Sequence, residues 1–156
     1  MYPWTHFIYG LIFALIGIKV GLIDFNLAVF LVLFTLFVDL DHLINYFINK
    51  KSWNLFKAWN YYHEKKDINP ERIFHSFFFV EIVLLLSIIL YFINAGWSYV
   101  LFAGYIIHRV LDYLNEYLNL KIKYKKIKIK GLRIRVYAYE IVLDIIGLIV
   151  LVMLLV

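Results

Sequence analysis

Five long apolar stretches constrain this chain more than any other feature of its sequence. They cover about residues 7–23, 25–47, 73–93, 97–118 and 141–156. Each approaches or exceeds the roughly 20 residues that an α-helix needs to cross a bilayer. The pattern therefore predicts about five transmembrane helices.

Composition excludes a water-soluble domain. Of the 156 residues, 64% are apolar and 17% are charged, whereas soluble domains are about half apolar and about one quarter charged. We therefore predict an all-α membrane protein in which residues 1–156 form a single integral membrane domain. Its core is expected to be a bundle of about five transmembrane helices.

Two long polar segments, residues 49–72 and 119–139, interrupt the apolar stretches. In the first, aromatic residues recur every three positions among lysines, which is typical of a short helix lying in the membrane interface. In the second, basic and aliphatic residues alternate with a period of two, which favours a small basic β-hairpin.

The distribution of basic residues predicts the orientation. Of the 16 Lys and Arg residues, 14 lie in the two long segments, Arg109 lies within the fourth apolar stretch, and Lys19 lies at the opposite end of the bundle. Because positively charged loops stay in the cytoplasm, we expect both segments and the N-terminus to be cytoplasmic. The protein is expected in the cell (inner) membrane, with its C-terminus on the outer side.

This topology gathers histidines and carboxylates in the cytoplasmic halves of the spans. Charged groups inside a bilayer are costly, so a convergent set of them is a candidate functional site. His108 and Asp112 are four residues apart and Asp39 and His42 are three apart, so each pair shares a helix face. The candidate metal ligands are His6, Asp39, His42, His75, His108 and Asp112.

Imidazole with carboxylate is a donor set that suits zinc, manganese, iron or nickel. The chain has no cysteine, which argues against a structural zinc site. We expect a divalent metal, zinc first and manganese as the alternative, with Asp41 or Glu81 as general base. Six candidate ligands are more than one tetrahedral site can hold. Either two metals bind, or some of these residues hydrogen-bond to the ligands without binding the metal themselves. The role of His63, in the first polar segment, stays open.

The order of these motifs resembles the YdjM-like family, which is described as inner-membrane-associated, LexA-binding and composed of metal-dependent hydrolases. The matching motifs are Thr5-His6, Asp39-x-Asp41-His42, His75-Ser76 and Gly104-x-x-x-His108-x-x-x-Asp112. The family usually has proline where Val38 stands, and a further histidine before His75. The histidine pattern is also similar in type to zinc-dependent phospholipase C enzymes, a resemblance that implies phosphoester chemistry.

Three functions follow as hypotheses. The first is a metal-dependent hydrolase that acts on a phosphoester or lipid headgroup at the cytoplasmic membrane face, with membrane lipids as partners and anionic phospholipid as a candidate substrate. The second is a proton or metal-ion carrier that uses the same residues. The third is a non-catalytic scaffold; a nucleic-acid partner is not expected, and no protein partner is indicated.

Overall fold

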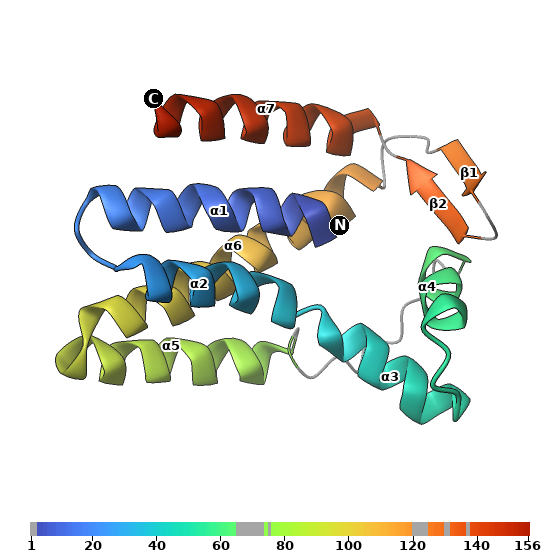
Figure 1. The fold of residues 1–156 in the computed structure, drawn as a ribbon. Helices are drawn as coiled ribbons and strands as arrows, with labels where there is room; N and C mark the ends of the chain where they lie inside the picture. The colour runs from blue at the N-terminus through green and yellow to red at the C-terminus, as the bar shows by residue number, and fades with distance from the viewer. Residues whose placement is uncertain (1–2, 65–73, 75, 120–124, 130–131, 137) are drawn as a thin grey trace.

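The computed structural model describes residues 3–64, 74, 76–119, 125–129, 132–136 and 138–156. Seven helices and two strands occupy these ranges (Figure 1). In chain order they are α1 (Pro3–Lys19), α2 (Phe25–Phe37), α3 (Leu40–Lys50), α4 (Leu55–Glu64), α5 (Phe77–Ile93), α6 (Ala95–Asn119), β1 (Lys125–Ile129), β2 (Leu132–Val136) and α7 (Ala138–Leu155). The fold is thus almost entirely helical.

In the view of Figure 1, α7, α1, α2 and α5 run roughly parallel, and α6 crosses obliquely behind α2 and α1. α1 contacts α2, α6 and α7, and α6 also contacts α2 and α5. The centre of the bundle is built from small and branched aliphatic side chains, among them Ala14, Ala28, Leu31 and Ala103. Small residues at helix contacts let backbones approach closely, as is typical of helices that associate in lipid.

The helix boundaries follow from local chemistry. α1 begins at Pro3, four residues before the predicted apolar span, because proline fits the first turn of a helix. It ends at Lys19, and the following turn uses Gly21 at a φ of 70°, which glycine adopts without strain. α2 and α5 begin after Asp24 and Ser76, whose side chains accept hydrogen bonds from the Leu27 and Phe79 N–H groups at 2.8 and 3.2 Å.

The predicted second span, residues 25–47, is interrupted by a turn at residues 38–39. The Asp39 N–H group donates to the Leu36 carbonyl, three residues back, instead of the carbonyl of Thr35 four residues back. Aspartate is a poor residue for a helix interior because its side chain competes for backbone hydrogen bonds. The interruption leaves the Thr35 carbonyl available to another partner.

By length and composition, one helix among the described residues is long and apolar enough to cross a membrane: Phe25–Lys50, which comprises α2, the turn and α3. α1 and α5 are apolar but shorter. Large apolar side chains nevertheless cover the outer surfaces of the bundle, among them Phe77 and Phe92 on α5 and Met153 on α7. Such a surface suits lipid better than water.

Beyond the bundle, β1 pairs antiparallel with β2, so that Lys126 lies opposite Arg135 and Lys128 opposite Arg133. α4 contacts both α3 and β2. Figure 1 shows α3, α4 and the two strands on the side of the bundle where the N-terminus lies.

Candidate metal centre

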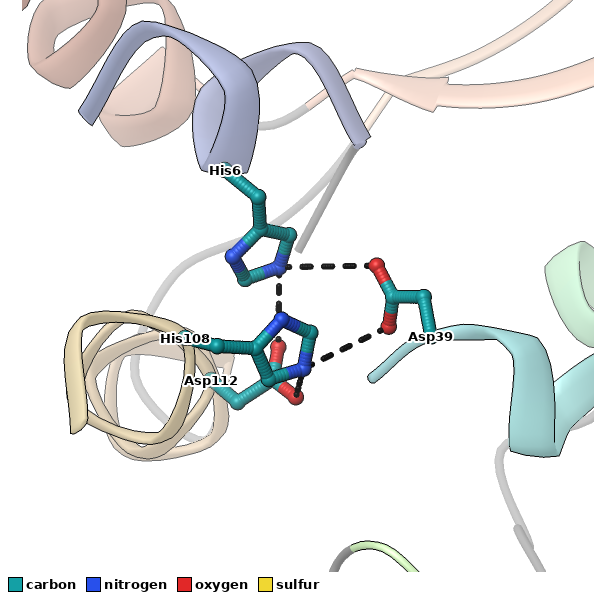
Figure 2. A group of neighbouring side chains, drawn as sticks. All are labelled: His6, Asp39, His108 and Asp112. Carbon is teal, nitrogen blue, oxygen red and sulfur yellow. Dashed lines mark ion pairs between the residues drawn. The ribbon is translucent and has the colours of Figure 1, made fainter. Parts of the chain in front are cut away.

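Four side chains from three parts of the chain meet at one end of the bundle. His6 comes from the first turns of α1, Asp39 from the turn between α2 and α3, and His108 and Asp112 from successive turns of α6 (Figure 2). Both histidine side chains are fully buried, and the two carboxylates are 18% and 15% exposed. The group therefore lies inside the protein and is open to the outside only through its carboxylates.

The donor atoms are spaced as the ligands of one metal ion would be. His108 Nε2 lies 3.2 Å from Asp112 Oδ2 and 3.6 Å from Asp39 Oδ1. His6 Nε2 lies 3.4 Å from Asp112 Oδ1 and 3.8 Å from Asp39 Oδ2. A tetrahedral ion with metal–ligand bonds of about 2 Å holds its donors about 3.3 Å apart. One donor atom from each of the four residues lies within 4.8 Å of every other.

The two imidazole rings stack on one another, with centroids 4.1 Å apart and an angle of 17° between the planes. Two stacked imidazolium ions would repel each other in this buried setting. A metal ion bound by two neutral rings and flanked by two carboxylates avoids that repulsion. The stack therefore favours neutral rings, and neutral imidazole is the form that binds a metal ion.

A backbone hydrogen bond fixes the orientation of His108. Its Nδ1–H group donates to the Thr35 carbonyl at 2.8 Å, the carbonyl that the turn between α2 and α3 leaves available. Since a carbonyl only accepts, the proton of the neutral ring is on Nδ1, and the lone pair of Nε2 faces the carboxylates. Such second contacts are the usual way in which proteins orient metal-binding histidines.

The surroundings of the His6 ring indicate whether these residues fit a bound metal ion. Neither of its ring nitrogens has a partner at hydrogen-bonding geometry in the part of the chain that the structure describes, although the side chain is fully buried. Leaving a buried polar atom without a partner is costly. A metal ion on Nε2 would satisfy one of the two nitrogens, so the residues present fit a bound divalent cation.

Two glycines bring the ligand-bearing helices together. Gly10 lies one turn after His6 on α1, and a Cβ atom there would come within 2.7 Å of Thr35 Oγ1 on α2. Gly104 lies one turn before His108 on α6, and a Cβ atom there would come within 2.9 Å of Phe34 Cδ1. Each glycine lies on the same helix face as its histidine. Close packing against α2 therefore places both rings at the turn that carries Asp39.

Among the described residues, four of the six predicted ligands are brought together in this group, and His42 is not part of it. His42 borders the group, with its Nε2 atom 3.5 Å from Asp39 Oδ1. His75 lies outside the described residues. Of the predicted bases, Asp41 is buried with Oδ1 3.9 Å from His42 Nδ1, whereas Glu81 is exposed on α5 and is not brought into the group.

Sequence reasoning missed the supporting residues of the centre. The Thr35 carbonyl is a backbone group, and no side-chain pattern reports which carbonyl a helix break will leave available. Gly104 belongs to one of the sequence motifs, but the motif does not report its role in helix packing, and none of the motifs includes Gly10. The four-residue spacings of His6 with Gly10 and of Gly104 with His108 were the available signal.

Comparison with known proteins completes the description. No curated protein and no solved structure matches the chain. The profile of one protein family matches residues 1–118, which contain all four side chains of the group and the helices that hold them. α7 and the two strands lie beyond the matched segment. Because the match covers more than half of the sequence, the chain belongs to the YdjM inner membrane protein family.

Proposed function

We propose that this protein is a membrane-bound metal-dependent hydrolase that acts on a phosphoester, such as a lipid headgroup, at the cytoplasmic face of the inner membrane. One observation carries the proposal: two histidine Nε2 atoms and two carboxylates, from three separate parts of the chain, converge with the spacing of metal ligands. Mixed histidine and carboxylate sites with room for water are typical of catalytic centres.

His6, Asp39, His108 and Asp112 would hold the ion, zinc first and manganese as the alternative. Bound there, a divalent metal would lower the pKa of a water molecule and polarise a phosphoryl oxygen. Two protein carboxylates leave the site with little net charge once a divalent cation binds. The site would then tolerate the approach of an anionic phosphoester better than a more acidic cluster would.

His42 and Asp41 extend the centre on the side of α3. His42 Nε2 faces Asp39, and Asp41 Oδ1 is the acidic atom near the other ring nitrogen of His42. The pair is therefore suited to accept a proton from the reaction and to pass it away from the ligands. Glu81, exposed on α5, is the less favoured of the two predicted bases.

The membrane arrangement is part of the same proposal. Five spans, formed by α1, α2 with α3, α5, α6 and α7, would place the N-terminus in the cytoplasm and the C-terminus outside. The excess of basic residues in the two polar segments supports this orientation. Since His6 lies near the start of α1 and Asp39 in the second half of the span formed by α2 with α3, the centre would lie in the cytoplasmic half of the bundle, on the side from which lipid phosphates would approach.

The test is an assay of purified protein against phospholipids and generic phosphoesters, with zinc, manganese or magnesium added. We expect hydrolysis by the wild type and none by His108→Ala or Asp112→Asn. Asp24→Asn is the matched control, because Asn also caps a helix well and residue 24 lies at the other end of α2. Hydrolysis that survives in both site variants would refute the proposal.

Metal binding without hydrolysis would favour the carrier hypothesis instead. In that case His108→Ala would reduce ion flux into liposomes, which the same preparations can measure. Wild-type protein that binds no metal under any of these conditions would remove the hydrolase from consideration.

A further inference from the structure

A second surface, away from the metal centre, combines exposed apolar and basic side chains. It runs from the end of α3 into the start of α4, and we call it the α3–α4 surface. Its members are Ile48, Lys50, Lys51, Trp53, Leu55, Phe56 and Lys57, all exposed. A soluble face would not normally gather this many large apolar side chains in ten residues.

The packing of α3 against α4 leaves these side chains exposed. Trp53 is 83% exposed, yet its ring stacks on Phe47 with centroids 4.8 Å apart. On the inner side, Ala58 is fully buried, and the ring of Tyr46 lies 5.4 Å from that of Tyr61. α3 and α4 therefore bury one side and present the other, as an amphipathic interfacial helix does.

Basic residues flank these exposed apolar side chains along the chain. Lys51 adopts a left-handed conformation with a φ of 49°, which ends α3 and turns the chain toward α4. This turn places Lys50 and Lys51 just before Trp53 and Phe56, and Lys57 just after them. Tryptophan beside lysine is the composition that proteins use at the level of lipid headgroups.

The strands add a second, independent observation. Their register pairs Lys126 with Arg135 and Lys128 with Arg133, two like-charged pairs directly across the hairpin. A two-stranded hairpin is marginal by itself, and this register brings four basic residues into two adjacent strands. An anionic partner would offset their charge, and β2 contacts α4, so the same partner can reach both (Figure 1).

We infer that the α3–α4 surface and the hairpin dock on anionic phospholipid headgroups and so hold this end of the protein on the membrane surface. The partner has to provide negative charge for the lysines and an apolar phase for Trp53, Leu55 and Phe56. A bilayer that contains anionic lipid provides both side by side, whereas a nucleic acid offers no apolar phase to aliphatic side chains. Docking of this kind requires no metal.

Fluorescence of Trp53 in lipid nanodiscs tests the inference in the full-length chain. A variant with Trp4, Trp59 and Trp97 changed to Phe retains Trp53 alone. In phosphatidylglycerol nanodiscs we expect blue-shifted emission, quenched more by lipids brominated near the headgroup than by lipids brominated at the chain end. In phosphatidylcholine nanodiscs we expect weaker quenching. Emission typical of tryptophan in water, in both lipids, would overturn the inference.

Charge variants show which residues carry the selectivity. Native mass spectrometry in detergent can compare the retention of phosphatidylglycerol and phosphatidylcholine. We expect K50Q/K51Q/K57Q and K126Q/K128Q/R133Q/R135Q each to lower the preference for phosphatidylglycerol several-fold. The matched control K50R/K51R/K57R should keep the preference, because it preserves the charge. An unchanged preference in both Gln variants would contradict the inference.

Two further outcomes separate this surface from other sites. His108→Ala should retain phosphatidylglycerol as well as the wild type does. If it does not, the lipid binds at the metal centre, and the inference fails. Tighter binding of a single-stranded oligonucleotide than of phosphatidylglycerol, abolished in the Gln variants, would assign the surface to nucleic acid instead.

Discussion

α3 connects two regions that use charged and polar residues in opposite ways. At its start, the metal centre buries imidazoles and carboxylates so that their donor atoms converge. At its end, about 16 Å away along the helix, the α3–α4 surface exposes lysines and aromatic rings to the outside. The difference teaches that burial and convergence, rather than charged residues as such, mark a candidate catalytic site in this chain.

Packing explains the contrast. At the metal centre, Gly10 and Gly104 let α1 and α6 approach α2 so closely that a single added methyl group would clash. At the α3–α4 surface, α4 contacts only α3 and β2 among the described elements with substantial contacts. Close packing fixes donor atoms to within the tolerance of a metal ion, whereas a surface that meets fluid lipid needs no such precision.

The largest expected effect is on metal binding at the metal centre, the buried one of the two regions. Asp112→Asn removes a charged donor that lies 3.2 Å from His108 Nε2 and 3.4 Å from His6 Nε2. Because changes outside the ligands already cost 10- to 100-fold in metal affinity, we expect a loss of more than about 100-fold. Competition with a chromophoric chelator measures the affinity. K50Q/K51Q/K57Q, which neutralises the exposed end, should bind metal as tightly as the wild type, and a comparable loss there would contradict the contrast.

Glycine substitutions test whether close helix packing is needed for stability and for metal binding. Gly10→Ala and Gly104→Ala should each lower the free energy of unfolding by about 1–3 kcal/mol, the usual cost of overpacking. Because they push α1 or α6 away from α2, they should also weaken metal binding several-fold. Isothermal titration and denaturant unfolding in detergent measure the two effects.

Gly147→Ala is the matched control for these variants. A Cβ atom at Gly147 would come within 2.7 Å of Ile8 Cγ2, so α7 and α1 should separate and the protein should be destabilised. Gly147 does not face α2 or α6 in these contacts, so metal affinity should stay unchanged. Weakened metal binding in Gly147→Ala alone would show that α7, and not the contact with α2, positions His6.

The sequence predicted much of the centre because its signals are local. The spacing of His108 and Asp112 places both on one face of any helix. The break beside Asp39 was not predicted, although it lies where the apolar part of the second span gives way to its amphipathic part. The starts of α1 and α5 differ from the predicted spans by a few residues, because a first-turn proline at Pro3 and a capping side chain at Ser76, and not hydropathy, set them.

What the sequence did not predict depends on tertiary contact. His6 and His108 stack only because two glycines permit close approach, and the distance between helices is not encoded in either helix alone. His42 has the same spacing to Asp39 as a ligand would, yet it lies at the border of the group because the turn before α3 directs the helix away. The membership of a site is therefore settled by packing.

The smallest expected effect lies far from both regions. Ser98 Oγ donates a hydrogen bond to the Ser87 carbonyl at 2.7 Å and so connects α6 with α5. Hydrogen bonds between helices in membranes average about 0.6 kcal/mol, so Ser98→Ala should destabilise the bundle by about that amount. Denaturant unfolding measures the loss, and metal affinity should not change. A large loss of metal binding would mean that the far end of α6 controls the centre.

Metal content tests the central claim most directly. Purified wild-type protein, loaded with zinc and freed of excess ion, should retain about one ion per chain by inductively coupled plasma mass spectrometry, as four converging donors require. His108→Ala should retain only background metal, while its circular dichroism stays as helical as that of the wild type. A wild-type chain that retains no metal, or a His108→Ala chain that retains as much as the wild type, would contradict the account.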